Sequence, residues 1–198
     1  MFKDKILLLP LIIIGICLLG AIGIGIYKFT RPAHPSYLDS GFHVHADFKV
    51  YLNGQAVDFT GAKYQSTEEK HLDEYAHLHD GNGGVLHIHK AGITLNYFFK
   101  TLGIEFTHDC FILDTKERFC TTPTSTLQVF VNGQKNDQLS EYIPQDLDHI
   151  LITYGATSTA EIDQELKSIT DNACIYSKKC PERGSAPVES CVVGEPCR

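Results

Sequence analysis

The sequence contains no tryptophan, a single methionine at position 1, and no surplus of basic residues. The first 31 residues hold four of the 17 Lys and Arg and one of the 24 Asp and Glu, which leaves 13 basic and 23 acidic residues and a net charge of −10 for the rest. Such a domain repels phosphate backbones, so we expect no nucleic-acid partner. The lack of a second methionine argues against a thioether Cu(I) chaperone.

Common catalytic motifs are absent as well. The chain has no H-E-x-x-H, no nucleophile elbow, no Walker loop and no C-x-x-C pair. An exterior zinc hydrolase would need an open coordination position and a general base, for which the candidates are Asp47, Asp73, Glu74 and Asp80. Catalysis therefore stays an open alternative without a motif to support it, and no catalytic residue is assigned.

The N-terminus carries the longest apolar run. Residues 6–26, ILLLPLIIIGICLLGAIGIGI, contain no charge and match the ~20 residues that a membrane-spanning helix needs. A cleaved signal peptide is the rival interpretation, but its apolar core is about 7 to 15 residues long and ends in a small-x-small site. We therefore predict a transmembrane anchor over 6–26, a cytoplasmic end over 1–5 and a spacer over 27–41.

Cysteine usage indicates the compartment of the rest of the chain. Six cysteines follow the anchor as three close pairs: Cys110 with Cys120, Cys174 with Cys180, and Cys191 with Cys197. Close pairs of this kind are typical of disulfides in an oxidising compartment. A four-cysteine zinc knuckle in the tail is the competing interpretation, although the usual C-x2-C spacing is missing. We expect a single-pass membrane protein whose C-terminal part is extracytoplasmic.

The pattern of strands and turns predicts an α+β domain over residues 42–156. Alternating apolar residues mark strands at 42–52, 85–89, 127–131 and 149–154, and Asn-Gly pairs follow the first and third of these. A helix that starts at Thr94 buries Leu95 and Phe98. We expect a mostly antiparallel sheet with one packed helix, in a β-grasp-like arrangement. A shorter helix over 157–172, with a capping box at Ser158 and Glu161, and a disulfide-stapled tail over 173–198 complete the chain.

Six of the ten histidines form three H-x-H units. Residues i and i+2 of a strand project from the same face, so each unit presents two imidazoles side by side. The DGNGG turn after the second unit brings it back beside the third. The predicted metal ligands are His43, His45, Asp47, His77, His79, His87 and His89. Imidazole without thiolate favours zinc or Cu(II). The other histidines, at positions 34, 71, 108 and 149, are not assigned as ligands.

Two other interpretations of the histidines remain. A single H-x-H is most often a half-exposed strand face, although packing gives no reason to repeat imidazole three times. A histidine face could also sense pH, since neighbouring imidazoles protonate together below about pH 6.5.

The stretch from about residue 43 to 155 resembles a family of uncharacterised membrane-anchored extracytoplasmic proteins of bacteria and archaea. The resemblance lies in HVHADFKVYLNG, in HLHDGNGGVLHIH followed by ITLNYFFKTLGI, and in DHILITYG. The tail segment CPERGSAPVESC is similar too. The resemblance implies an anchor and exterior placement, and no established activity comes with it. Members of that family often carry Glu at the position of His89, which makes His89 the least secure ligand.

The sequence thus favours an anchored exterior protein that captures or delivers a transition metal. The alternative is a structural or interaction module at the cell surface, whose protein partner the sequence does not identify.

Overall fold

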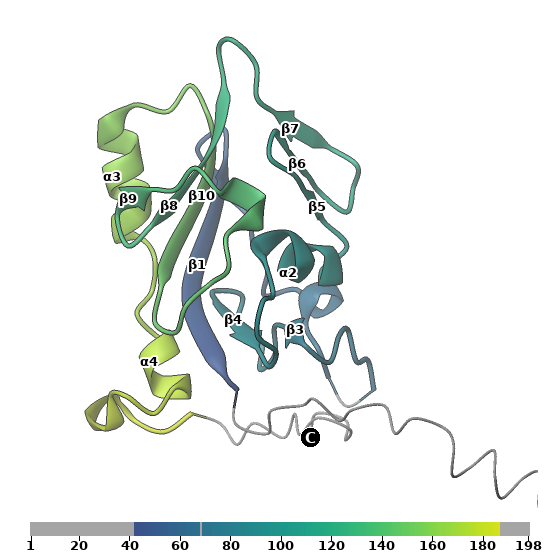
Figure 1. The fold of residues 1–198 in the computed structure, drawn as a ribbon, viewed down its shortest axis with the longest axis vertical. Helices are drawn as coiled ribbons and strands as arrows, with labels where there is room; N and C mark the ends of the chain where they lie inside the picture. Colours follow the sequence, from purple (N-terminus) through teal and green to yellow (C-terminus); the bar gives the residue numbers. More distant parts are fainter. Residues whose placement is uncertain (1–41, 68, 187–198) are drawn as a thin grey trace, which may run out of the picture. The chain divides into compact units, whose positions relative to one another are not determined.

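The structure is a computed structural model, and it describes residues 42–67 and 69–186 (Figure 1). These residues belong to one compact unit. The predicted α+β class with a mostly antiparallel sheet is confirmed. The segments predicted at 1–5, 6–26 and 27–41, and the Cys191–Cys197 pair, lie outside the described residues.

The main sheet has the strand order β3-β4-β1-β10-β8-β9, with β2 paired to β1. Its strands are β1 (Val44–Leu52), β2 (Gln55–Ala56), β3 (Ala76–His77), β4 (Val85–Ile88), β8 (Thr126–Val131), β9 (Gln134–Lys135) and β10 (His149–Gly155). The central pair, β1 and β10, is parallel, and the other pairs are antiparallel. Both Asn-Gly pairs adopt positive φ, as the predicted tight hairpin turns require.

Alternation along β1 gives the sheet two different faces. Phe48 and its even-numbered neighbours on the strand are buried in the hydrophobic core. Helix α2 (Leu95–Thr101) packs on this face, with the rings of Phe98 and Phe99 at 5.4 and 5.9 Å from the ring of Phe48. The helix begins where it was predicted, and Thr94 caps it by accepting a hydrogen bond from the Tyr97 amide. The odd-numbered residues of β1, from His45 to Tyr51, project from the other face.

A second sheet of three strands extends the hydrophobic core on the side of the main sheet that carries α2. It consists of β5 (Glu105–Phe106), β6 (Cys110–Ile112) and β7 (Arg118–Cys120). The Cys110–Cys120 disulfide, which joins the paired strands β6 and β7, confirms the predicted cysteine pair. The two-residue strand β5 was not predicted, because nothing in so short a segment distinguishes it from a loop.

The C-terminal segment runs along the histidine face of the main sheet. It contains α3 (Thr159–Lys167), which begins at the predicted capping box, and α4 (Ala173–Tyr176). The Cys174–Cys180 disulfide staples the end of α4 to the following turn, as predicted. Three short 3-10 helices, η1 (Ala62–Tyr64), η2 (Leu139–Glu141) and η3 (Pro181–Arg183), complete the elements. In Figure 1, α3 and α4 lie on one side of the sheet and α2 on the other.

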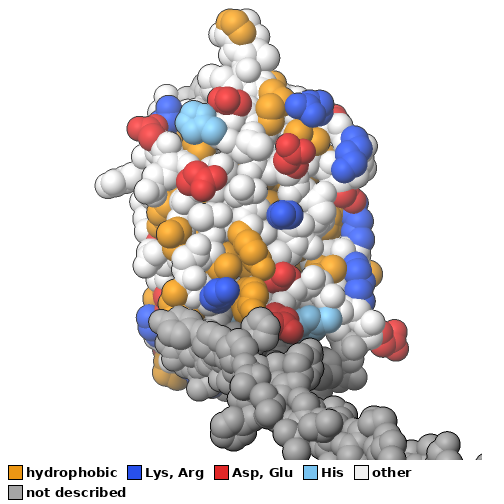
Figure 2. Space-filling model, turned by 45° about the vertical axis from the view of Figure 1, so that its right-hand side comes forward, with side chains coloured by type: hydrophobic (Ala, Val, Ile, Leu, Met, Phe, Trp, Pro, Cys, Tyr) orange, Lys and Arg blue, Asp and Glu red, His pale blue; other side chains and the backbone are white. Residues whose placement is uncertain are grey.

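Within residues 42–67 and 69–186, no helix has the length and apolar character to cross a membrane. Figure 2 shows acidic and basic side chains interspersed over one face of the molecule, with hydrophobic side chains between them.

Candidate metal centre

Strand register lines up three histidines from three strands. His45 of β1 is opposite His87 of β4, and His87 is opposite His77 of β3. Directly opposed residues project from the same face, so these imidazoles form a row across the sheet. The three side chains are at most 2 % exposed. Such a row of buried, titratable rings requires a physical reason, because burying polar groups costs free energy unless they have partners.

The other three histidines of the H-x-H units join this row. The ring of His79 lies 3.8 Å from that of His87, and the ring of His89 lies 4.9 Å from that of His77. His43 is exposed at the start of β1, with its ring 4.7 Å from that of His89. We call these six residues the histidine cluster: His43, His45, His77, His79, His87 and His89. The structure therefore brings together all six histidines that the spacing singled out.

The hydrogen bond of His77 fixes its tautomer. Its Nδ1 lies 2.8 Å from the backbone carbonyl oxygen of Asp73, which can only accept, so Nδ1 carries the proton and Nε2 carries the lone pair. The Nε2 atom is buried without a hydrogen-bond partner among the described residues. Burial lowers the pKa of His77 to about 4, partly opposed by the Asp73 carbonyl. The imidazole is therefore neutral at pH 7, the form that binds a metal ion.

A chain of hydrogen bonds orients His79 and His87. The Nδ1 atom of His79 donates to Oδ2 of Asp80 at 2.8 Å, so its Nε2 atom carries the lone pair. That Nε2 lies 3.0 Å from Nδ1 of His87, which must then be the donor. The lone pair of His87 is therefore on Nε2. Asp80 reaches His79 from the turn between β3 and β4, where Asp80 and Gly81 both have positive φ.

His45 is oriented by the C-terminal segment. The Ser177 hydroxyl donates to Asp146 at 2.6 Å, so its oxygen accepts from Nδ1 of His45 at 2.9 Å. Burial alone would raise the pKa of Asp146, but hydrogen bonds from Lys179, Ser177 and the His45 amide lower it overall. The carboxylate thus remains ionised and holds Ser177 in place. The lone pair of His45 is on Nε2, as in His77 and His87.

Asp47 has a different environment from the histidine cluster. Its buried carboxylate accepts hydrogen bonds from the Thr170 hydroxyl and from the amides of Asn172 and Ala173. Potential ligand atoms of Asp47, His149 and Asp171 lie within 4.8 Å of one another. Because Asp171 also forms an ion pair with Arg183 at 2.7 Å, both carboxylates of this group already have protein partners. We assign Asp47 a structural role here, and its role as a ligand stays a prediction.

Sequence reasoning did not identify the residues that orient the imidazoles. The Tyr176 ring of α4 lies 4.7 Å from the ring of His87, and Ser177 follows it. Both are more than 80 positions from the histidines that they contact, and no local pattern marks them. Of the unassigned histidines, His71 is exposed with its ring 6.1 Å from that of His77, whereas exposed His108 pairs with Asp109.

Four histidines of the cluster, His45, His77, His79 and His87, thus have an acceptor for the Nδ1 proton and a lone pair on Nε2, which are features of transition-metal sites. In the described part of the chain, no three ring nitrogens of the cluster lie within 4.8 Å of one another, so a shared ion would require the rings to move closer together. The four described cysteines are disulfide-bonded, so they offer no thiolate. Comparisons with protein-family models, with curated proteins and with solved structures found no match for this chain.

Proposed function

We propose that this protein binds a transition-metal ion, zinc or Cu(II), through the histidine cluster. One observation carries the proposal: three cross-strand neighbours, His45, His87 and His77, each have Nδ1 committed as a donor to a protein acceptor, so that Nε2 is the ligating atom. Metal-binding histidines commonly have a second interaction of this kind, which fixes the tautomer and the ring orientation. His79, His89 and His43 are further candidate ligands in the same cluster.

The choice of metal follows from the ligand chemistry. Neutral imidazole suits zinc and Cu(II), whereas Cu(I) prefers thiolate or thioether ligands. Described cysteines are in disulfides, and the only methionine is residue 1. We therefore expect zinc or Cu(II) rather than Cu(I).

The proposed setting is the exterior side of a membrane, with residues 6–26 as the anchor and capture or delivery of metal as the role. The apolar run and the two disulfides support this placement, as does the family resemblance. The parallel central pair β1–β10, flanked by β4 and β8 and crossed by α2, supports a β-grasp-like fold. The exterior placement and the β-grasp-like fold are both parts of the proposal.

Elemental analysis of the full-length chain, exported into an oxidising compartment and loaded with zinc or copper, tests the site. We expect stoichiometric metal in the parent and none in a variant with His45→Ala, His77→Ala and His87→Ala. His108→Ala is the matched control, because His108 is exposed and outside the cluster, and it should bind as much metal as the parent.

A second measurement does not depend on the folding of the triple variant. A ligand that binds only the folded form raises the unfolding midpoint, so zinc or copper should raise the melting temperature of the parent. A parent that takes up no metal and shows no shift would overturn the proposal.

The alternative is an interaction module whose histidine face responds to pH. The hydrogen bond between His79 and His87 favours it, because a proton on Nε2 of His79 would remove the acceptor of that bond. In that case metal would leave the melting temperature unchanged, whereas acidification would change the binding of a partner to this face.

A further inference from the structure

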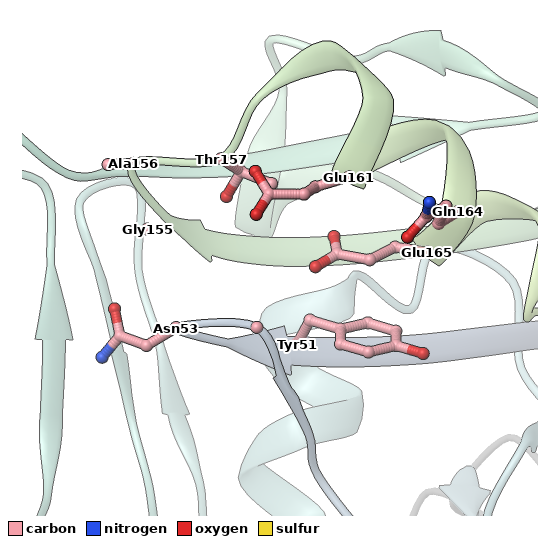
Figure 3. A pocket seen from close by; sticks show the side chains of 9 residues that line it. Tyr51, Asn53, Gly155, Ala156, Thr157, Glu161, Gln164 and Glu165 are labelled. Carbon is pink, nitrogen blue, oxygen red and sulfur yellow. The ribbon is translucent and has the colours of Figure 1, made fainter.

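A cavity lies on the same face of the sheet as the histidine cluster but at the other end of β1. It has a volume of about 520 Å³, within the range of small-molecule sites. The turn after β1, the end of β10 and helix α3 form its walls (Figure 3). Its lining includes the side chains of Tyr51, Asn53, Glu161, Gln164 and Glu165. At about 3.3 Å per residue, Tyr51 lies roughly 20 Å along the strand from His45.

Glu165 is the unusual member of the lining. It is the only residue of α3 that is buried, at 6 % exposed, whereas Ile162 and Leu166 are half-buried. Its Oε2 atom has no hydrogen-bond partner in the described part of the chain, and neither has the Oγ1 atom of Thr153 nearby. A buried carboxylate oxygen without a donor is costly. In Figure 3 the Glu165 carboxylate points into the space between Tyr51 and the Glu161 side chain.

Burial raises the pKa of Glu165, and the Thr153 hydroxyl offsets this effect only in part. The folded protein thus offers the ionised carboxylate too little hydrogen bonding to compensate for its burial. A bound cation would supply both the missing donor and the compensating charge.

The rest of the lining favours a positively charged ligand. It contains a second carboxylate, Glu161, together with the side-chain amides of Asn53 and Gln164, and it includes no Lys, Arg or His. Oε2 of Glu161 accepts from the amide and from the hydroxyl of Ser158, each at 2.7 Å, and the carboxylate adds negative charge to the cavity. Tyr51 adds an aromatic ring, a surface on which ammonium groups pack well. The volume suits an organic cation rather than a bare ion.

We propose that this cavity binds small organic ammonium compounds, whose N–H group donates to the carboxylate of Glu165 while their carbon atoms pack on Tyr51. The site is separate from the histidine cluster, and the proposal does not depend on metal binding. It gives the protein a second ligand class, drawn from amines rather than metals.

Isothermal titration calorimetry on the detergent-solubilised full-length chain tests this site with n-butylammonium as the probe. EDTA in the buffer keeps metal away from the histidines. The neutral isostere 1-butanol provides the comparison, because it fills nearly the same volume without the charge. We expect the parent to bind butylammonium at least tenfold more tightly than butanol. Glu165→Gln, which keeps the shape and removes the charge, should weaken butylammonium binding at least tenfold.

Glu141→Gln is the matched control, since Glu141 is exposed on η2 and away from the cavity, and it should bind like the parent. The proposal is overturned if the parent does not bind butylammonium, or if butanol binds equally well. Equal binding by the folded Glu165→Gln variant would also overturn it. The comparison of the two probes on the parent stays decisive even if that variant fails to fold.

Discussion

At the scale of single residues, hydrogen bonds on the Nδ1 atoms decide what the histidines can bind. Asp80 is the start of one such chain, because it accepts from His79, whose other nitrogen accepts from His87. A carboxylate at this position makes the imidazole a better electron donor and fixes its orientation. The consequence reaches His87, two hydrogen bonds away from the carboxylate.

We expect Asp80→Asn to weaken zinc binding roughly tenfold or more, in line with the loss of other outer-shell carboxylates. Asparagine tolerates the positive φ of this position, so the turn should keep its conformation. Competition with a zinc-binding dye measures the affinity. Asp109→Asn is the control, because Asp109 makes the same contact to the exposed His108 at 3.1 Å. Equal affinities of the two variants would show that Asp80 does not support the site.

The residue pattern predicted the membership of the cluster but not its hydrogen bonds. The H-x-H spacing determines which side chains share a strand face, and that is local information. The partners of His45, by contrast, are Ser177 and Asp146, 132 and 101 positions away for the contacts involved. Glu165 was not predicted either, because the periodicity of α3 places Ile162 and Leu166 against the sheet, whereas the structure buries the acidic residue between them more completely.

At the scale of elements, Asp47 connects the central strand to the C-terminal segment. Its carboxylate accepts from Thr170, Asn172 and Ala173, just before and at the start of α4. These bonds hold in place the helix that covers the histidines. They also explain why Asp47, an acidic residue, can lie in the middle of the sheet with no exposed surface.

We expect Asp47→Asn to lower the free energy of unfolding by roughly 2 to 3 kcal/mol, because one carboxylate oxygen that accepts from backbone amides is replaced by a donor. Chemical denaturation measures the loss, and amide exchange at residues 172–177 should become faster. Asp58→Asn serves as the control, since exposed Asp58 bonds only with Thr60 among the described residues. A parent-like stability of the Asp47 variant would contradict the structural role.

The elements themselves were predictable to different degrees. Asn53-Gly54 and Asn132-Gly133 identify their hairpins, because few other pairs adopt the two successive positive φ angles. The capping residues Thr94 and Ser158 likewise identify where α2 and α3 begin. The parallel pairing of β1 with β10 has no such local signal, since it depends on where the whole intervening chain returns. Helix α4 was not predicted either, and its residues fell within the predicted disulfide-stapled tail.

At the scale of the whole molecule, the stability of the fold depends on pH through the buried carboxyl group of Glu165. The folded-state pKa of Glu165 is raised, chiefly by burial, so the folded protein holds this proton more tightly than the unfolded chain. Its contribution to stability is complete below the ordinary pKa of 4.5 and is lost as the pH rises through the folded-state value. At neutral pH the ionised group is a cost to folding.

We therefore expect Glu165→Gln, without an amine ligand, to be more stable than the parent at pH 7 and to lose this advantage near pH 4. Denaturant titrations at several pH values measure the difference. Glu161→Gln should behave in the opposite way, because the Ser158 hydroxyl and amide lower the pKa of Glu161 and stabilise its ionised form. If the stability of the two variants, relative to the parent, changed with pH in the same direction, the opposite pKa shifts of Glu165 and Glu161 would be contradicted.

The central position of β1 also determines the order in which the molecule can be assembled. The strands that carry the histidines, β1, β3 and β4, lie within residues 44–88, whereas the contact of Asp47 with Asn172 spans 125 positions. Short loops close sooner than long ones, so these strands can pair while the C-terminal segment is still unattached. We therefore expect the imidazoles to be open to solvent early in folding and to be covered late. If the proposed metal ion binds there, its exchange in the folded protein should require the C-terminal segment to detach first.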